Sequence, residues 1–116
     1  MEETPEYLAT CVALGTASDG QRNALATVCR DYALVVAKSA VKRRLLPPCD
    51  VDDIAQLATV KALASASKWK MERGSWKTFV GVIARTAILD QRRMYAKDAA
   101  LKADLGSMID ETEIEE

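Results

Sequence analysis

The stretch KWKMERGSWKTF, residues Lys68–Phe79, separates two segments that both show helical periodicity. It contains three lysines, one arginine and three of the six aromatic residues in the chain. Gly74 and Ser75 interrupt it, because glycine disfavours a helix interior and serine is a good N-terminal cap. The stretch therefore predicts an exposed turn between two helices, with Ser75 capping the second.

The two predicted helices cover residues 50–69 and 76–103. Asp50 is expected to cap the first of them, and the carboxylates of Asp52 and Asp53 suit the positive end of its macrodipole. Apolar residues recur at three- and four-residue steps in both segments. The core positions expected from this pattern are Ile54, Leu57, Ala58, Leu63, Ala66, Phe79, Val82, Ile83, Ala87 and Ile88.

Two more helices are predicted in the N-terminal half. Thr4 as a cap and Pro5 at the first helical position favour a short helix that ends near Leu14. A longer helix is expected over residues 21–45, where two prolines follow and stop it. Its expected core positions are Leu25, Val28, Cys29, Tyr32, Val35, Val36 and Ala40.

These elements predict an all-α fold, a compact bundle of three long helices plus a short N-terminal helix. The predicted organisation is a short helix and turn over residues 1–20, a helical domain over 21–103, and an acidic, flexible tail over 104–116. No apolar run approaches the ~18 residues of a membrane span, and the acidic start does not resemble a secretory leader. We therefore expect a cytoplasmic protein with no membrane partner.

Positive charge is concentrated in the middle of the chain. All sixteen Lys and Arg residues lie between residues 22 and 102, together with only seven Asp and Glu, so this span carries a formal charge of +9. The net charge of the whole chain is −1, because the other ten acids lie at the two ends. A basic body indicates a polyanionic partner such as nucleic acid, although solvated helix faces are also basic in many proteins.

Residues for common catalytic sites are missing. The chain has no histidine, which excludes Ser–His and Cys–His nucleophiles. Its cysteines, Cys11, Cys29 and Cys49, lack zinc-site spacing and are interpreted as buried thiols in a reducing compartment. Capping explains the acids at the start of the 50–69 helix, and the five scattered glycines form no phosphate-binding loop. We expect a protein that is not an enzyme and that binds no metal or cofactor.

The 68–79 turn is the main candidate for nucleic-acid contact, because cations bind phosphates and aromatic rings stack on unpaired bases for roughly 1–3 kcal/mol each. Trp69 ends an apolar helix face and is interpreted as a core residue. For Trp76 two interpretations stay open, a ring that closes the bundle and a ring that stacks on bases. Arg85, Arg92 and Arg93 extend the basic surface along the following helix.

Residues 50–93 resemble the second conserved region of bacterial RNA polymerase sigma factors, in particular the small extracytoplasmic-function class. The matching pieces, in order, are Asp53-Ile54-Ala55-Gln56, Trp69, Arg73-Gly74-Ser75, Trp76 with Phe79, Ile83-Ala84-Arg85, and Asp90 with Arg92-Arg93. Two positions depart from the pattern: Leu57 replaces the usual acid, and Thr86 replaces the usual asparagine. The chain also ends where the family continues to its fourth region, as in late sigma factors of large bacteriophages or one half of a split sigma.

The resemblance implies two sets of contacts. In the family, the helix with Asp-x-x-Gln docks on the clamp helices of the polymerase's largest subunit, and the next helix start captures bases flipped from the non-template strand of the minus-ten element. The implied polymerase contacts are Asp53, Gln56, Leu57, Thr59, Val60 and Leu63. The implied contacts with melted DNA are Lys70, Arg73, Ser75, Trp76, Lys77, Thr78 and Phe79. The implied contacts with the upstream duplex are Arg85, Thr86, Arg92 and Arg93.

The function expected from the resemblance is a sigma-like transcription initiation factor in a bacterial host cell. It would bind core RNA polymerase, recognise and melt the minus-ten element, and need a co-sigma or co-activator protein for upstream contacts. The first alternative is a sigma mimic that occupies the clamp and inhibits host sigma without melting DNA, and the second is a generic helical DNA-binding module. The acidic end, with Met108, Ile109 and Ile114, is either a docking peptide for a co-activator or sliding clamp, or a solvated terminus.

Overall fold

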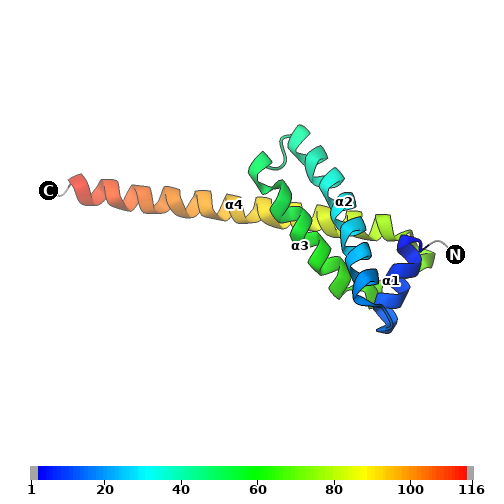
Figure 1. Cartoon of the computed structure of the whole chain (residues 1–116). Helices are drawn as coiled ribbons and strands as arrows, with labels where there is room; N and C mark the ends of the chain where they lie inside the picture. The colour runs from blue at the N-terminus through cyan, green and yellow to red at the C-terminus, as the bar shows by residue number, and fades with distance from the viewer. Residues whose placement is uncertain (1–2, 115–116) are drawn as a thin grey trace.

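The computed structural model describes residues 3–114 and contains four α-helices (Figure 1). They are α1 (Pro5–Leu14), α2 (Asp19–Lys42), α3 (Val51–Ala64) and α4 (Trp76–Ile114), and no strand occurs within 3–114. Short 3-10 turns at Pro48–Asp50, Ala66–Lys68 and Met71–Arg73 lie in the connections. The predicted all-α class is confirmed. The expectations for residues 1–2 and 115–116, at the ends of the N-terminal segment and the acidic tail, lie outside the described residues.

Side-chain caps set the start of three helices. The Thr4 hydroxyl accepts a hydrogen bond from the Tyr7 amide at 3.1 Å, and the Ser75 hydroxyl accepts one from the Thr78 amide at 3.2 Å, as predicted. Ser18 forms a reciprocal capping box with Gln21, so α2 begins at Asp19, two residues earlier than expected.

None of the helices in the described part is long and apolar enough to cross a membrane.

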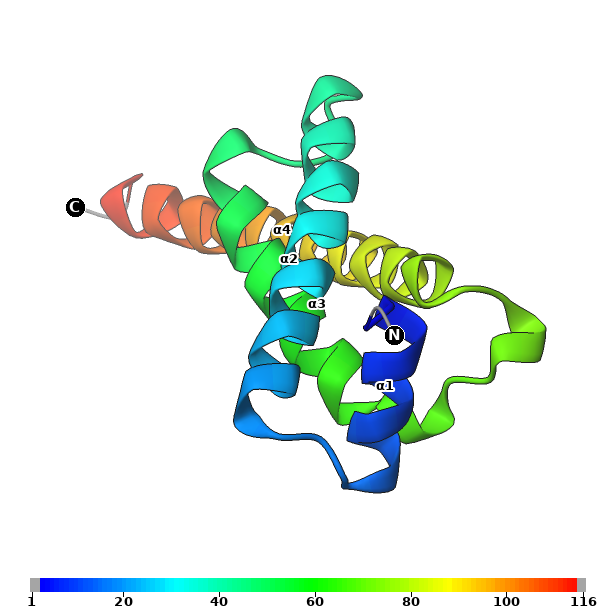
Figure 2. The same cartoon turned by 45° about the vertical axis from the view of Figure 1, so that its right-hand side comes forward.

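Small side chains line the contacts among α2, α3 and α4. Ala33 and Ala37 of α2, Ala55 and Ala58 of α3, and Ala84 of α4 are fully buried, which lets the helix backbones approach closely. Trp76 is the largest fully buried side chain of the core. The helix α1 packs against α2 and the turn after α3 (Figure 2).

Three predicted core residues are exposed, and those predictions were wrong. Val35, Leu57 and Val82 are 66%, 41% and 53% exposed. The buried stripe of α3 consists of Ile54, Ala55, Ala58 and Ala62, so alanine occupies positions that the pattern gave to larger residues. Because alanine-lined helices pack closely, larger side chains at the edge of the stripe remain outside the contact. Of the cysteines, Cys29 is buried as expected, but Cys49 is exposed.

Two helix ends also differ from the prediction. The helix α3 ends at Ala64 rather than near residue 69, and α4 continues past residue 103 to Ile114. From Arg92 to Leu105 every residue of α4 is exposed, and this half of the helix projects from the bundle (Figure 1). The molecule is therefore elongated, with extents of 75 × 28 × 25 Å.

Asp50 was predicted to cap α3, but its side chain makes no capping hydrogen bond to the helix. Its carboxylate accepts a hydrogen bond from the Tyr95 hydroxyl of α4 and one from the Cys49 thiol at 3.7 Å, and the residue is only 8% exposed. The hydrogen bond to this carboxylate raises the pKa of Tyr95 above its ordinary value. Asp50 thus links the start of α3 to the point where α4 leaves the bundle.

Candidate nucleic-acid and protein interfaces

The turn between α3 and α4 closes on Trp69. The indole Nε1 of Trp69 donates a hydrogen bond to the Gly74 carbonyl at 3.1 Å. Gly74 has a φ of 141°, a backbone conformation that residues with a Cβ rarely adopt, so glycine is required here to turn its carbonyl toward the indole. The half-buried ring of Trp69 also packs edge-on against Trp76, with ring centroids 5.6 Å apart.

Trp76 lies in the core and is 0% exposed. Its Nε1 donates a hydrogen bond to Cys29 Sγ at 3.3 Å, and its ring centroid lies 5.1 Å from that of Phe79. Burial raises the pKa of the Cys29 thiol to about 11. The sequence left two interpretations of Trp76 open. The structure agrees with the ring that closes the bundle, and the interpretation as an exposed ring that stacks on bases was wrong. The buried ring of Trp76 has no exposed face on which a base could stack.

A hollow of about 210 Å³ opens between the turn and the start of α4. The rings of Trp69 and Phe79 form its aromatic lining, cations and hydroxyls of the turn and the first turn of α4 contribute polar groups, and Gly74 and Val82 complete it. Five residues expected at melted DNA line this hollow, namely Lys70, Arg73, Ser75, Thr78 and Phe79. Lys68 and Trp69 of the candidate turn also line it, although neither is among the DNA contacts that the resemblance implies. The position of Trp69 at a helix end was a signal for burial, and the residue is in fact only half buried.

Lys77 lies apart from the hollow. Its Nζ sits 5.6 Å from the centroid of the Tyr32 ring, in a cation–π contact with α2. The expected duplex contacts Arg85, Thr86, Arg92 and Arg93 are all exposed on α4. Arg93 pairs with Asp90 at 3.5 Å, and the Thr86 hydroxyl donates to the Val82 carbonyl of its own helix at 2.9 Å.

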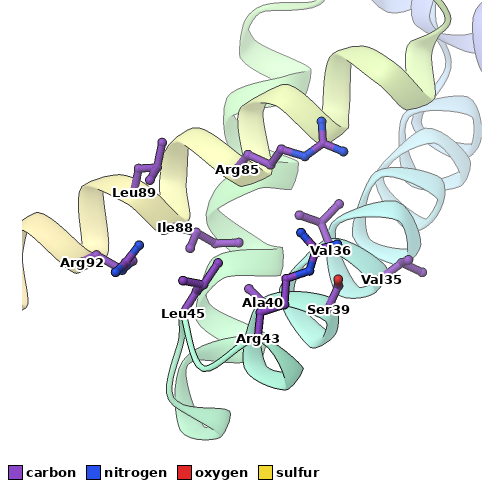
Figure 3. Close-up of a pocket in the computed structure, with 10 residues that line it drawn as sticks. All are labelled: Val35, Val36, Ser39, Ala40, Arg43, Leu45, Arg85, Ile88, Leu89 and Arg92. Carbon is purple, nitrogen blue, oxygen red and sulfur yellow. The ribbon is translucent and has the colours of Figure 1, made fainter.

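A second groove, of about 410 Å³, lies between α2 and α4 (Figure 3). Arg85 and Arg92 line it from α4, and Arg43 lines it from the end of α2. The sequence interpretation missed Arg43, since nothing in the local pattern relates the end of α2 to a position more than forty residues later. The structure thus gathers cations from two helices around one groove.

The expected polymerase contacts on α3 separate into two groups. Asp53, Gln56, Leu57 and Val60 are exposed, and the last two are 41% and 59% exposed. Thr59 is half-buried and donates its hydroxyl to the Ala55 carbonyl at 2.8 Å, while Leu63 packs against the core. A hollow of about 530 Å³ beside this face is lined by Gln56, Thr59 and Val60 and by α2 residues that the sequence interpretation missed, namely Asn23, Ala26, Thr27 and Arg30.

The family model for sigma-70 region 2 matches residues 30–97, which is more than half of the chain. The matched span runs from the middle of α2 through α3 and the turn into α4, and so includes the exposed face of α3 and the 68–79 turn. No curated protein and no solved structure matches the chain. Sigma region 2 is a non-enzymatic, helical domain of transcription factors that act with core RNA polymerase and promoter DNA. The chain therefore belongs to the sigma-70 region 2 family.

Proposed function

We propose that this chain is a transcription initiation factor that binds core RNA polymerase through α3 and holds unpaired bases of the minus-ten element at the 68–79 turn. The observation that carries the proposal is the hollow of about 210 Å³ lined by Trp69, Phe79, Lys70 and Arg73. It combines aromatic rings with cations and hydroxyls in one place. That is the combination that binding of single-stranded nucleic acid requires.

The chemistry of the hollow suits a planar base attached to a phosphate backbone. Drug-sized ligands occupy pockets of roughly 300–1,000 Å³, so the smaller hollow fits a single ring system better than an extended ligand. Extruding a base costs a few kcal/mol, and stacking on an aromatic ring offsets about 1–3 kcal/mol of that cost. The hydroxyls of Ser75 and Thr78 are available to hydrogen-bond the edge of a base, and Lys70 and Arg73 can neutralise the flanking phosphates.

The exposed face of α3 supports a protein contact. Leu57 and Val60 form an apolar centre, with Asp53 and Gln56 as polar neighbours on the same helix. An apolar centre within a polar rim is typical of protein interfaces. The usual acid of the family is replaced by Leu57, so in our proposal the docking on the clamp helices depends more on burial of apolar surface than on charge.

The arginines of α4 support a contact with the duplex next to the melted bases. Arg85 and Arg92 are exposed and seven residues apart, which places them on one side of the helix. Phosphate contacts of this kind position a protein on DNA and weaken with added salt.

Run-off transcription with core polymerase, on duplex and pre-melted versions of one promoter, tests the proposal. Arg73→Ala is expected to lower transcription from the duplex template about tenfold, because loss of a charged hydrogen bond costs roughly 1.5–3 kcal/mol. Binding to core polymerase stays unchanged, and the pre-melted template restores most of the transcript. Leu57→Lys is expected to weaken polymerase binding and to reduce transcription from both templates, because it places a positive charge in the apolar centre of the exposed α3 face. Lys38→Ala on α2, an exposed cation outside both surfaces, is the matched control.

A sigma mimic that blocks the clamp is the second candidate. Burial of Trp76 removes one of the rings expected for DNA contact, while Leu57 and Val60 remain available to a protein. A blocker would suppress transcription by another sigma factor and yield no transcript of its own on either template. Start-site-specific transcripts that depend on this chain would contradict that candidate.

A further inference from the structure

The C-terminal end of α2 carries positive charge with no acidic residue near it in the sequence. Residues 32–49 contain four cations and no Asp or Glu, and the cations are Lys38, Lys42, Arg43 and Arg44. All four side chains are exposed. A run of exposed like charge on one segment indicates a polyanionic ligand.

Arg44 has a backbone conformation that arginine rarely adopts. It follows the end of α2 with a φ of 60°. Its amide donates a hydrogen bond to the Val41 carbonyl at 3.0 Å, and the Leu45 amide donates one to the Ala40 carbonyl at 2.8 Å. This pair of bonds is the Schellman motif, in which glycine is the favoured residue at the position of Arg44. Because side chains that are strained in this way concentrate at functional sites, a long cation here favours a role in binding.

Two adjoining hollows bring this end of α2 next to α4. The groove of about 410 Å³ has Arg43 on its α2 side and Arg85 and Arg92 along α4 (Figure 3). A second hollow, of about 480 Å³, is lined by Arg44 and again by Arg92. Leu45 also lines both hollows, and no Asp or Glu lines either of them. Four arginines from two helices therefore border one continuous surface.

The four arginines are available to a ligand. Over residues 3–105, where side chains are described, the two ion pairs of the chain involve other arginines. Between the helices the groove has an apolar floor that includes Ile88 and Leu45. An arginine stem can lie along apolar surface and keep its guanidinium group in water, so this floor is compatible with phosphate contacts at its edges.

We propose that the end of α2 contacts the same DNA duplex as α4, with Arg43 and Arg44 as phosphate contacts beside Arg85 and Arg92. The inference rests on the proposed function, in which the duplex contacts come from α4 alone. Phosphate contacts fix the orientation of a protein on DNA without reading its sequence. Cations on two helices thus hold the duplex across the junction of α2 and α4.

An acidic protein helix is the other class of ligand for an apolar groove with arginines at its edges. The charge distribution favours the duplex. Protein interfaces are depleted in charged residues at their centre, whereas interfaces with DNA are much more positively charged. Four cations without an acid over residues 32–49 match the second kind of surface.

Fluorescence anisotropy of a labelled duplex of about 20 base pairs, titrated with the full chain at several salt concentrations, tests the proposal. Each neutralised phosphate contributes about −0.9 to the slope of log affinity against log salt concentration. Arg43→Ala should therefore reduce the slope by about 0.9 and lower the affinity about five- to tenfold at about 0.1 M salt. Arg43→Lys keeps the charge and should retain the slope. Lys38→Ala removes a cation of α2 outside both hollows and should change the affinity less than about twofold.

Arg44→Gly separates binding from folding. Glycine suits a φ of 60°, so the midpoint of urea denaturation should stay unchanged or rise. The affinity for the duplex should nevertheless fall about five- to tenfold at about 0.1 M salt, as for Arg43→Ala. A variant that binds the duplex as tightly as the wild type would contradict the proposal.

Two further results would overturn the contact from α2. Equal losses in Arg43→Ala and Lys38→Ala would mean that the cations act as diffuse charge and not as phosphate contacts. If Arg43→Ala leaves duplex binding unchanged but weakens binding to core polymerase, the end of α2 is a protein contact. Failure of the proposed duplex contact itself has a different signature, because Arg85→Ala and Arg92→Ala would then also leave duplex binding unchanged.

Discussion

The two halves of α4 form one continuous helix in different surroundings. In the first half, Trp76, Val80, Ala84, Ala87 and Ile88 are at most 5% exposed and pack against α2 and α3. In the second half, every residue from Arg92 to Leu105 is exposed. The helical conformation therefore has two different sources of stability within this one helix.

The composition of each half agrees with this difference. The first half contains β-branched residues at Thr78, Val80, Val82 and Ile83, as well as Gly81, all of which are poor helix formers. It is helical because tertiary packing compensates for low propensity. The second half is rich in Ala, Leu and Lys, which favour a helix, and it extends an already formed helix without a new nucleation step.

The largest expected effect comes from Trp76→Ala. Removing this fully buried ring should lower the free energy of unfolding by about 3–5 kcal/mol, through lost burial and the cavity that remains. Leu101→Ala, in the exposed half, should change it by no more than about 0.5 kcal/mol. Urea denaturation followed by circular dichroism measures both values. Similar losses in the two variants would contradict the contrast between the halves.

A smaller effect is expected where the two halves meet. Tyr95→Phe removes the hydroxyl that donates to the nearly buried carboxylate of Asp50, and the free energy of unfolding should fall by about 1–2 kcal/mol. Met94→Ala, at the exposed neighbouring position, serves as the control and should cost less than about 0.5 kcal/mol. If both variants unfold at the same urea concentration as the wild type, the Asp50–Tyr95 contact does not hold α4 to the bundle.

Gly81→Ala is expected to stabilise the first half. A Cβ at Gly81 would meet only the end of the Arg85 side chain, at 3.8 Å, which is an ordinary contact. Alanine has the higher helix propensity, so the free energy of unfolding should rise by about 0.5–1 kcal/mol. A loss of stability in the same denaturation experiment would mean that the helix contacts at this position leave no room for a methyl group.

At neutral pH the smallest effect is that of the Cys29 thiol, whose ionisation influences stability only in alkaline solution. Burial raises the pKa of this thiol from 9.0 to about 11, so the folded chain keeps its proton at a pH where the unfolded chain has lost it. The thiol's contribution to stability is complete below pH 9 and is lost as the pH rises from about 9 to about 11. Cys29→Ala should therefore show a flatter decline over this interval than the wild type. The exposed Cys49 provides the control, because Cys49→Ala should leave the slope unchanged.

Local sequence determined where α1 and α4 begin and which family the chain belongs to. Thr4 and Ser75 cap helices as their side chains predict, since a cap depends only on residues three positions away. The ordered motif between Asp50 and Arg93 likewise indicated sigma region 2 before any fold was known, and the family model confirmed it.

Only the tertiary structure decided which side of each element is buried. By its local pattern Trp76 could equally close the bundle or face solvent. In the fold it is buried in the core next to Cys29, forty-seven residues earlier, whose sulfur accepts its hydrogen bond. The approach of Arg43 to Arg85 and Arg92 also depends on how α2 crosses α4. Such contacts depend on the rotation and separation of whole helices, which close packing of distant alanines determines and which local periodicity does not encode.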